Sequence, residues 1–172
     1  AREPSLAAYG MSKAVAEKLI QESGLNWTIV RPPAVYGPHD KDMLELFKFA
    51  KFGFLPLPPN GVASIIHVSD LARLLWDLVA TPEELKLGHT FEPDDGKPGG
   101  WGHKELAIAI GGSVGKRIIP FQLAPFLLHL IAFFEKLFRG SNAKLTHDRV
   151  SYMCHPDWRS RRDFRVPSSI WQ

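Results

Sequence analysis

The sequence predicts an α/β layer structure with a mostly parallel sheet. Along the 172 residues, segments with helical spacing of apolar residues alternate with short runs rich in β-branched and aromatic residues. One such run, residues 26–31, is mostly apolar, as expected for a strand that is covered on both faces of a parallel sheet. The hydrophobic content of 45% supports a single globular unit with a real core.

Helices are expected at residues 6–23, 42–51, 69–80, 103–110, 123–138 and 146–153. The first consists of good helix formers and is closed by Gly24 as a C-cap. The second has apolar residues at helical spacing, while the third begins at the capping pair Ser69-Asp70 and stops at Thr81-Pro82. The fifth is apolar on nearly all of its faces, which favours burial over a position on a membrane surface.

Strands are expected at residues 26–31, 64–68, 89–93 and 117–119. Pro32 and Pro33 end the first strand, because proline offers no N–H group to a sheet ladder. Loops punctuated by glycine and proline are expected at residues 34–40, 53–61 and 94–102. The glycines of residues 111–115 follow a helix and are interpreted as its C-cap and turn.

Composition excludes several classes of function. A net charge of +3 is too small to predict a nucleic-acid partner, and the basic tail with Arg159, Arg161, Arg162 and Arg165 is expected to be solvated. Polar and proline residues interrupt residues 118–138, which predicts no transmembrane segment. A single cysteine and the lack of a secretion signal favour a reducing, cytoplasmic location.

No metal site is predicted, because the histidines are scattered and the Cys154-His155 pair lacks the spacing of ligands. Asp94 and Asp95 lie in a Gly/Pro-rich loop and are expected to be solvated turn residues. His67 is expected to be either a site residue at a strand end or a structural histidine.

The segment Tyr9-Gly10-Met11-Ser12-Lys13 carries the clearest chemical pattern. Residues four apart lie on one face of a helix, one turn from each other. The Lys13 ammonium favours the ionised form of the Tyr9 phenol, which suits that hydroxyl to donate or accept a proton. Because such pairs also occur by chance, the surrounding sequence decides the interpretation.

Two later segments supply that context. They are residues 31–38, Arg-Pro-Pro-Ala-Val-Tyr-Gly-Pro, and residues 66–72, Ile-His-Val-Ser-Asp-Leu-Ala. With the Tyr9/Lys13 segment they resemble the extended short-chain dehydrogenases/reductases, the NAD(P)-dependent epimerase/dehydratase and reductase group. The resemblance continues more loosely through Leu145-Thr146 and residues 155–158. It implies a partial Rossmann-type, doubly wound parallel sheet with a small mixed α/β substrate domain.

The resemblance also implies roles for individual residues. Tyr9 would act as the general acid/base on a substrate hydroxyl or carbonyl, and Lys13 would hydrogen-bond the nicotinamide ribose. Pro32, Pro33, Ala34 and Val35 would lie against the nicotinamide end of the cofactor. The cofactor is NAD or NADP, because the residue that distinguishes them belongs to a segment upstream of these motifs.

Residues 1–38 and 67–94 are expected to form the C-terminal part of the NAD(P)-binding Rossmann domain, and residues 39–66 and 95–172 the substrate-binding domain. The Gly-rich turn of a Rossmann fold and the active-site Ser/Thr of the family do not precede Tyr9 in this sequence. The chain is therefore interpreted as a C-terminal fragment that is inactive alone. Members of this family often dimerise through helices that include the Tyr-bearing one, so a homodimer is an open alternative.

The expected substrate is a small molecule, with a lipophilic alcohol or ketone favoured over a nucleotide-sugar. Relatives that use nucleotide-sugars commonly carry an Arg before the strand, where Ala63 and Ser64 stand here, to meet the diphosphate. The apolar side chains between Phe121 and Phe134 offer surface that walls a pocket or packs the small domain. Two alternatives stay open: a nucleotide-sugar epimerase/dehydratase, and a non-catalytic dinucleotide sensor or assembly scaffold.

Overall fold

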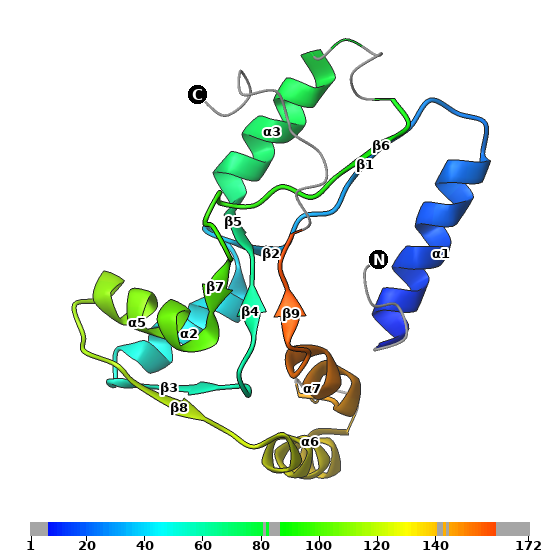
Figure 1. The fold of residues 1–172 in the computed structure, drawn as a ribbon. Coiled ribbons are helices and arrows are strands. Elements are labelled where there is room, and N and C mark those ends of the chain that lie inside the picture. Colours follow the sequence, from blue (N-terminus) through cyan, green and yellow to red (C-terminus); the bar gives the residue numbers. More distant parts are fainter. Residues whose placement is uncertain (1–6, 81, 83–86, 141–142, 144, 161–172) are drawn as a thin grey trace.

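The computed structural model describes residues 7–80, 82, 87–140, 143 and 145–160, and these residues form an α/β structure, as the sequence predicts (Figure 1). Its helices are α1 (Ala8–Glu22), α2 (Lys41–Ala50), α3 (Val68–Ala80), α5 (His103–Ser113), α6 (Pro125–Arg139) and α7 (His147–Met153). Its strands are β1 (Thr28–Val30), β2 (Ala34–Tyr36), β3 (Phe54–Leu57), β4 (Val62–Ala63), β5 (Ile65–His67), β6 (His89–Phe91), β7 (Trp101–Gly102), β8 (Ile119–Gln122) and β9 (Asp157–Trp158).

The strand pairs of the described residues are mostly parallel, which confirms the predicted sheet type. Strand β1 pairs with β6, β2 with β5 and β3 with β8, all in parallel. Strand β4 pairs in parallel with β9 and antiparallel with β7. Each of the three two-stranded pairs joins segments separated by intervening helices, as parallel strands require.

Three clusters of buried side chains hold these elements together. In the first, α2, β3, α5 and the approach to β8 meet around Leu55 and Ala107. The second packs α3 against the β1–β6 pair through Leu74, Leu78 and Phe91. The third joins α6 to α7 through Leu128, Ala132 and Val150.

All three segments predicted as loops contain strands; in residues 94–102 it is the short strand β7, which pairs with β4. Residues 34–36 form β2 and residues 54–57 form β3, because each finds a partner far along the chain. Pro56 is tolerated in β3 since a strand paired on one side leaves its other edge without a ladder. Local sequence patterns do not reveal such long-range pairing.

The helix that begins at His103 is longer than expected and includes Gly111 and Gly112. The turn follows at Gly115, whose φ of +68° suits glycine. A side chain at Gly111 would collide with Ile118, so this glycine allows the strand approach to pass close against α5.

The prediction that helix 123–138 is buried is wrong. Of the residues of α6, Leu128 and Ala132 are buried, whereas Phe126, Phe133 and Phe138 are 62–82% exposed. None of the described helices combines the length and apolar character needed to cross a membrane.

Candidate active site

Helix α1 presents Tyr9 and Lys13 on one face. The Lys13 ammonium nitrogen lies 5.5 Å from the centre of the Tyr9 ring, one helical turn away. The helix ends as expected: Gly24 adopts a φ of +72°, and the Ser23 N–H donates to the Ile20 carbonyl. The Ser12 hydroxyl donates to the Tyr9 carbonyl at 2.8 Å and is thus engaged with the helix backbone.

A cavity of about 570 Å³ brings most of the predicted site residues together. Its walls include Tyr9 and Lys13 from α1, Pro32 and Pro33 from the segment that joins β1 to β2, and Ala34 from the start of β2. The remaining residue of the predicted set, Val35, lies in β2 and does not line the cavity. Further lining residues are Gly10, Glu17, Val30, Arg31, Ala63, Ser64, Glu92, Tyr152, Trp158, Arg159 and Ser160.

The C-terminal part of the described chain supplies an aromatic wall that sequence reasoning missed. The rings of Tyr152 and Trp158 stack with centroids 4.2 Å apart and planes 24° apart. The Trp158 indole N–H also donates to the Tyr152 carbonyl at 2.9 Å, which fixes the stack. Burial raises the pKa of the Tyr152 phenol, and the nearby Tyr9 raises it further. Tyr152 therefore stays protonated near neutral pH, so its hydroxyl can donate a hydrogen bond.

A buried polar network fastens this C-terminal wall to the sheet. The Ser64 hydroxyl donates to an Asp94 carboxylate oxygen at 2.8 Å and accepts the Ser160 backbone N–H at 3.1 Å. The second Asp94 oxygen accepts the Gly96 N–H at 2.9 Å. Asp94 is 8% exposed, so the expectation that it is a solvated turn residue is wrong. A carboxylate can be buried here because hydrogen-bond donors surround it.

His67 and Cys154 lie outside the cavity walls. The His67 ring accepts the Ser69 N–H at 3.3 Å and contacts Tyr36 edge-on, which fits the structural alternative for this residue. Burial raises the pKa of the Cys154 thiol, which disfavours the reactive thiolate. Within the described ranges, no three His, Cys, Asp or Glu side chains gather as metal ligands would.

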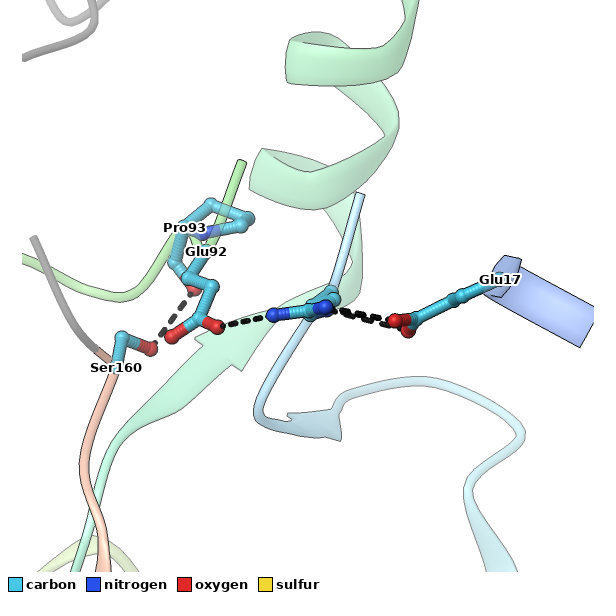
Figure 2. Close-up of polar contacts among 5 residues, drawn as sticks. Glu17, Glu92, Pro93 and Ser160 are labelled. Atoms are coloured by element: carbon cyan, nitrogen blue, oxygen red, sulfur yellow. Dashed lines mark hydrogen bonds and ion pairs between the residues drawn. The ribbon is translucent and has the colours of Figure 1, made fainter. Parts of the chain in front are cut away.

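Arg31 clamps helix α1 to the sheet beside the cavity. Its guanidinium donates to both Glu17 carboxylate oxygens, with Nη2 2.7 Å from Oε2, and its Nη1 donates to Glu92 at 3.1 Å. Figure 2 shows the two carboxylates on opposite sides of the guanidinium, with Ser160 donating to the Pro93 carbonyl nearby. Few residues of α1 are buried, so this charged contact is a main attachment of the helix that carries Tyr9 and Lys13.

Arg31→Ala is expected to lower the free energy of unfolding by about 2–3 kcal/mol. That value lies between the ~0–1 kcal/mol of exposed ion pairs and the ~3–5 kcal/mol lost when a buried pair is broken, since Arg31 is 33% exposed. Burial alone would raise the pKa of Glu17, but the hydrogen bonds and positive charges around this carboxylate, with Arg31 foremost, together lower the pKa below 4.5. The contribution of the Glu17 carboxylate to the free energy of unfolding is thus fully present above pH 4.5. It is lost as the pH falls through the lowered pKa of Glu17.

Urea unfolding of the full-length protein at several pH values measures this effect. Lys18→Ala, which breaks the exposed Lys18–Glu22 pair on the same helix, is the matched control and should change stability by less than about 1 kcal/mol. Equal stability of Arg31→Ala and the control at neutral pH would contradict the clamp.

Comparison with known proteins identifies the family. The model of the NAD dependent epimerase/dehydratase family matches residues 2–92. A ceramide reductase of Caulobacter vibrioides (strain NA1000 / CB15N) is 42% identical over 84 residues, which are 48% of this chain and 26% of that protein. The chloroplast stem-loop binding protein of 41 kDa b of Arabidopsis thaliana is 35% identical over 72 residues, 39% of this chain and 19% of that protein.

Solved structures extend the likeness over nearly the whole fold. The X-ray structure of Pal from Bacillus thuringiensis superposes with a TM-score of 0.57 at 14% identity, covering 94% of this chain and 46% of that one. The chain thus spans about a quarter or less of these curated relatives and about half of this structural neighbour. Because the family model matches more than half of its residues, this chain belongs to the NAD dependent epimerase/dehydratase family.

Proposed function

We propose that the full-length protein is an NAD(P)-dependent oxidoreductase that interconverts a lipophilic ketone and its alcohol. The observation that carries this proposal is the meeting of Tyr9, Lys13 and the Pro32–Ala34 segment in one cavity. An acid/base group, a cation and a flat apolar wall are the parts that a carbonyl reduction beside a nicotinamide ring requires.

The cavity walls fit the nicotinamide end of such a cofactor. Pro32, Pro33 and Ala34 offer apolar surface for a ring, and Lys13 offers an ammonium for the ribose hydroxyls next to it. A phosphate-binding Gly-rich turn between a strand and a helix N-terminus does not occur among the described residues. Lys13 and the Pro32–Ala34 segment are therefore assigned to the nicotinamide ribose end of the cofactor alone. Both NAD and NADP are compatible with this assignment.

When bound, the nicotinamide would supply the hydride in ketone reduction and accept it in alcohol oxidation. In reduction, the Tyr9 hydroxyl donates its proton to the substrate oxygen as that oxygen gains negative charge. Lys13 favours the resulting phenolate through its positive charge, one turn along the helix. Tyr152, which stays protonated, offers a second O–H donor in the same cavity. In oxidation, the Tyr9 phenolate takes the proton back.

We further propose that the cavity lies between a cofactor part, residues 1–38 and 67–94, and a substrate part, residues 39–66 and 95–172. The lining from Tyr9 to Ala34, with Glu92, comes from the first part. Ala63, Ser64 and the wall from Tyr152 to Ser160 come from the second. A substrate between them would face Tyr9 on one side and the aromatic stack on the other.

The lining favours a lipophilic substrate over a nucleotide-sugar. Arg31 is held by two glutamates, and Arg159 forms a two-pronged contact with Asp157, so both guanidinium groups have carboxylate partners. Ala63 and the engaged Ser64 add no charge that could clamp a diphosphate. The name of the related ceramide reductase also points to a lipid substrate.

The prediction of a lipophilic substrate rested partly on apolar side chains that do not line the cavity. Those between Phe121 and Phe134 are absent from its lining, and Tyr152 and Trp158 take their place. The substrate class is therefore proposed on the aromatic wall instead.

A thermal-shift screen of the full-length protein with reduced nicotinamide cofactor tests the substrate class. Long-chain ketones should raise the melting temperature, because a ligand at a hundred times its Kd stabilises the folded state by about 2.7 kcal/mol. Hits are then followed by consumption of the reduced cofactor. Stabilisation by nucleotide-sugars alone would overturn the substrate class, and binding of cofactor without any turnover would favour the non-catalytic alternative.

A further inference from the structure

Helix α6 exposes a continuous stripe of large apolar side chains. Six of them are 45–82% exposed: Phe126, Leu130, Phe133, Phe134, Leu137 and Phe138. At 100° per residue they span an arc of roughly 140°. The opposite side of the helix is buried, where Leu128 and Ala132 pack against Val150 of α7.

A second group of exposed apolar side chains lies on the β3–β8 strand pair. Phe54 of β3 and Ile119 of β8 are register partners and are 49% and 73% exposed. Phe121, two residues after Ile119 on the same strand face, is 58% exposed. Strand β8 leads directly into α6 at the lower end of the molecule in Figure 1. We call this surface of α6, β3 and β8 the basal face.

The segments that form the basal face are rich in basic residues. Residues 48–57 and 116–139, which form β3, β8, α6 and their approaches, carry six Lys or Arg and a single acid, Glu135. That acid is paired with Arg139 on the helix. Arg117, two residues before Ile119, and Lys136 are exposed. These segments hold more than the whole +3 surplus of the chain, so the basal face combines large apolar side chains with positive charge.

We infer that the basal face docks onto an anionic lipid surface. Aromatic and leucine side chains enter the boundary of the acyl chains, while flanking Lys and Arg meet anionic headgroups. This inference is independent of the reaction proposed above. It replaces the sequence-based expectation that the α6 segment is buried, because the exposure of its apolar side chains is now established.

Two other occupants fit the basal face less well. A second copy would bring two positively charged faces together in a symmetric contact, and like charges oppose such an interface. Further segments of the same protein have an open strand edge to join at β1, which pairs only with β6 among the described residues. Strand β1 and helices α1 and α3 lie at the other end of the molecule (Figure 1).

Flotation of the full-length protein with vesicles tests the inference. Vesicles of phosphatidylcholine with phosphatidylglycerol should carry the protein, pure phosphatidylcholine vesicles should carry less of it, and added salt should release it. The double variants Phe126→Ser/Phe133→Ser and Arg117→Glu/Lys136→Glu should each weaken partitioning by about tenfold or more. Lys18→Glu/Lys104→Glu makes the same change of charge at exposed sites on α1 and α5, and it should partition far more strongly than Arg117→Glu/Lys136→Glu.

Circular dichroism and melting of each variant verify that it is folded. Absence of flotation with anionic vesicles would overturn the inference. So would a concentration-dependent dimer that Phe126→Ser/Phe133→Ser dissociates, because a second copy would then cover the basal face. Equal partitioning of the two charge variants would overturn the electrostatic part. Loss of reductase activity does not bear on any of these outcomes, since flotation needs neither cofactor nor substrate.

Discussion

Replacing Tyr9 by phenylalanine in the full-length protein is expected to lower kcat by about 10²–10⁴-fold, the usual worth of a positioned acid/base group. The substitution removes only the hydroxyl from a side chain that is 66% exposed, so the fold should be retained. The proton would then have to come from water or from Tyr152, whose raised pKa suits it to hydrogen bonding rather than to proton release. Steady-state kinetics with a verified ketone measures the loss.

Tyr36→Phe is the matched control, because it removes the same hydroxyl from a tyrosine that does not line the cavity. Its kcat should stay within a few-fold of the wild-type value. Wild-type turnover by Tyr9→Phe would show that another group moves the proton, and the assignment of Tyr9 would fail.

Lys13→Met should weaken binding of the reduced cofactor by about 10–100-fold. A charge-assisted hydrogen bond contributes about 1.5–3 kcal/mol, and methionine keeps the length of the side chain without the ammonium. The variant should also lower kcat, since the Tyr9 phenolate loses its neighbouring cation. Fluorescence titration with reduced nicotinamide measures the first effect separately from catalysis.

Lys18→Met on the same helix serves as the control, because Lys18 does not line the cavity and pairs with Glu22 at the exposed end of α1. The Kd of this control for the cofactor should match that of the wild-type protein. If the two lysine variants bound cofactor equally well, Lys13 would not hold the nicotinamide ribose.

Local sequence patterns predicted the elements that depend on short-range signals. Helix α1 ends just before Gly24 as expected, and β1 stops before Pro32 because that residue has no N–H to donate. Strands β2 and β3 were missed because their stability comes from partners about 30 and 65 residues away. The exposed α6 was predicted as buried because its apolar residues cover most of its faces, and periodicity does not indicate which side meets a partner.

The candidate site also contains residues that the sequence predicted and residues that only the folded chain brings to it. Tyr9 and Lys13 were singled out by their spacing on one helix together with the family resemblance, and Pro32 to Ala34 by that resemblance alone. The cavity is also lined by Tyr152, Trp158 and Ser160, which come more than 110 residues after Ala34 in the sequence. They are brought to it by β9 and by the hydrogen bond between Ser160 and Ser64. The segment at residues 155–158 was noticed as part of a loose resemblance, but nothing in it indicated that Trp158 would line the same cavity as Tyr9.

The most direct test of the proposed function is a single-turnover reduction by the full-length protein with reduced nicotinamide that is deuterated at C4. A long-chain ketone identified in the thermal-shift screen is the substrate, and mass spectrometry follows the alcohol. We expect one deuterium on the carbinol carbon, formed at a rate that falls by about 10²–10⁴-fold in Tyr9→Phe. An alcohol without deuterium, or equal rates for the two proteins, would contradict nicotinamide-dependent reduction with Tyr9 as the proton donor.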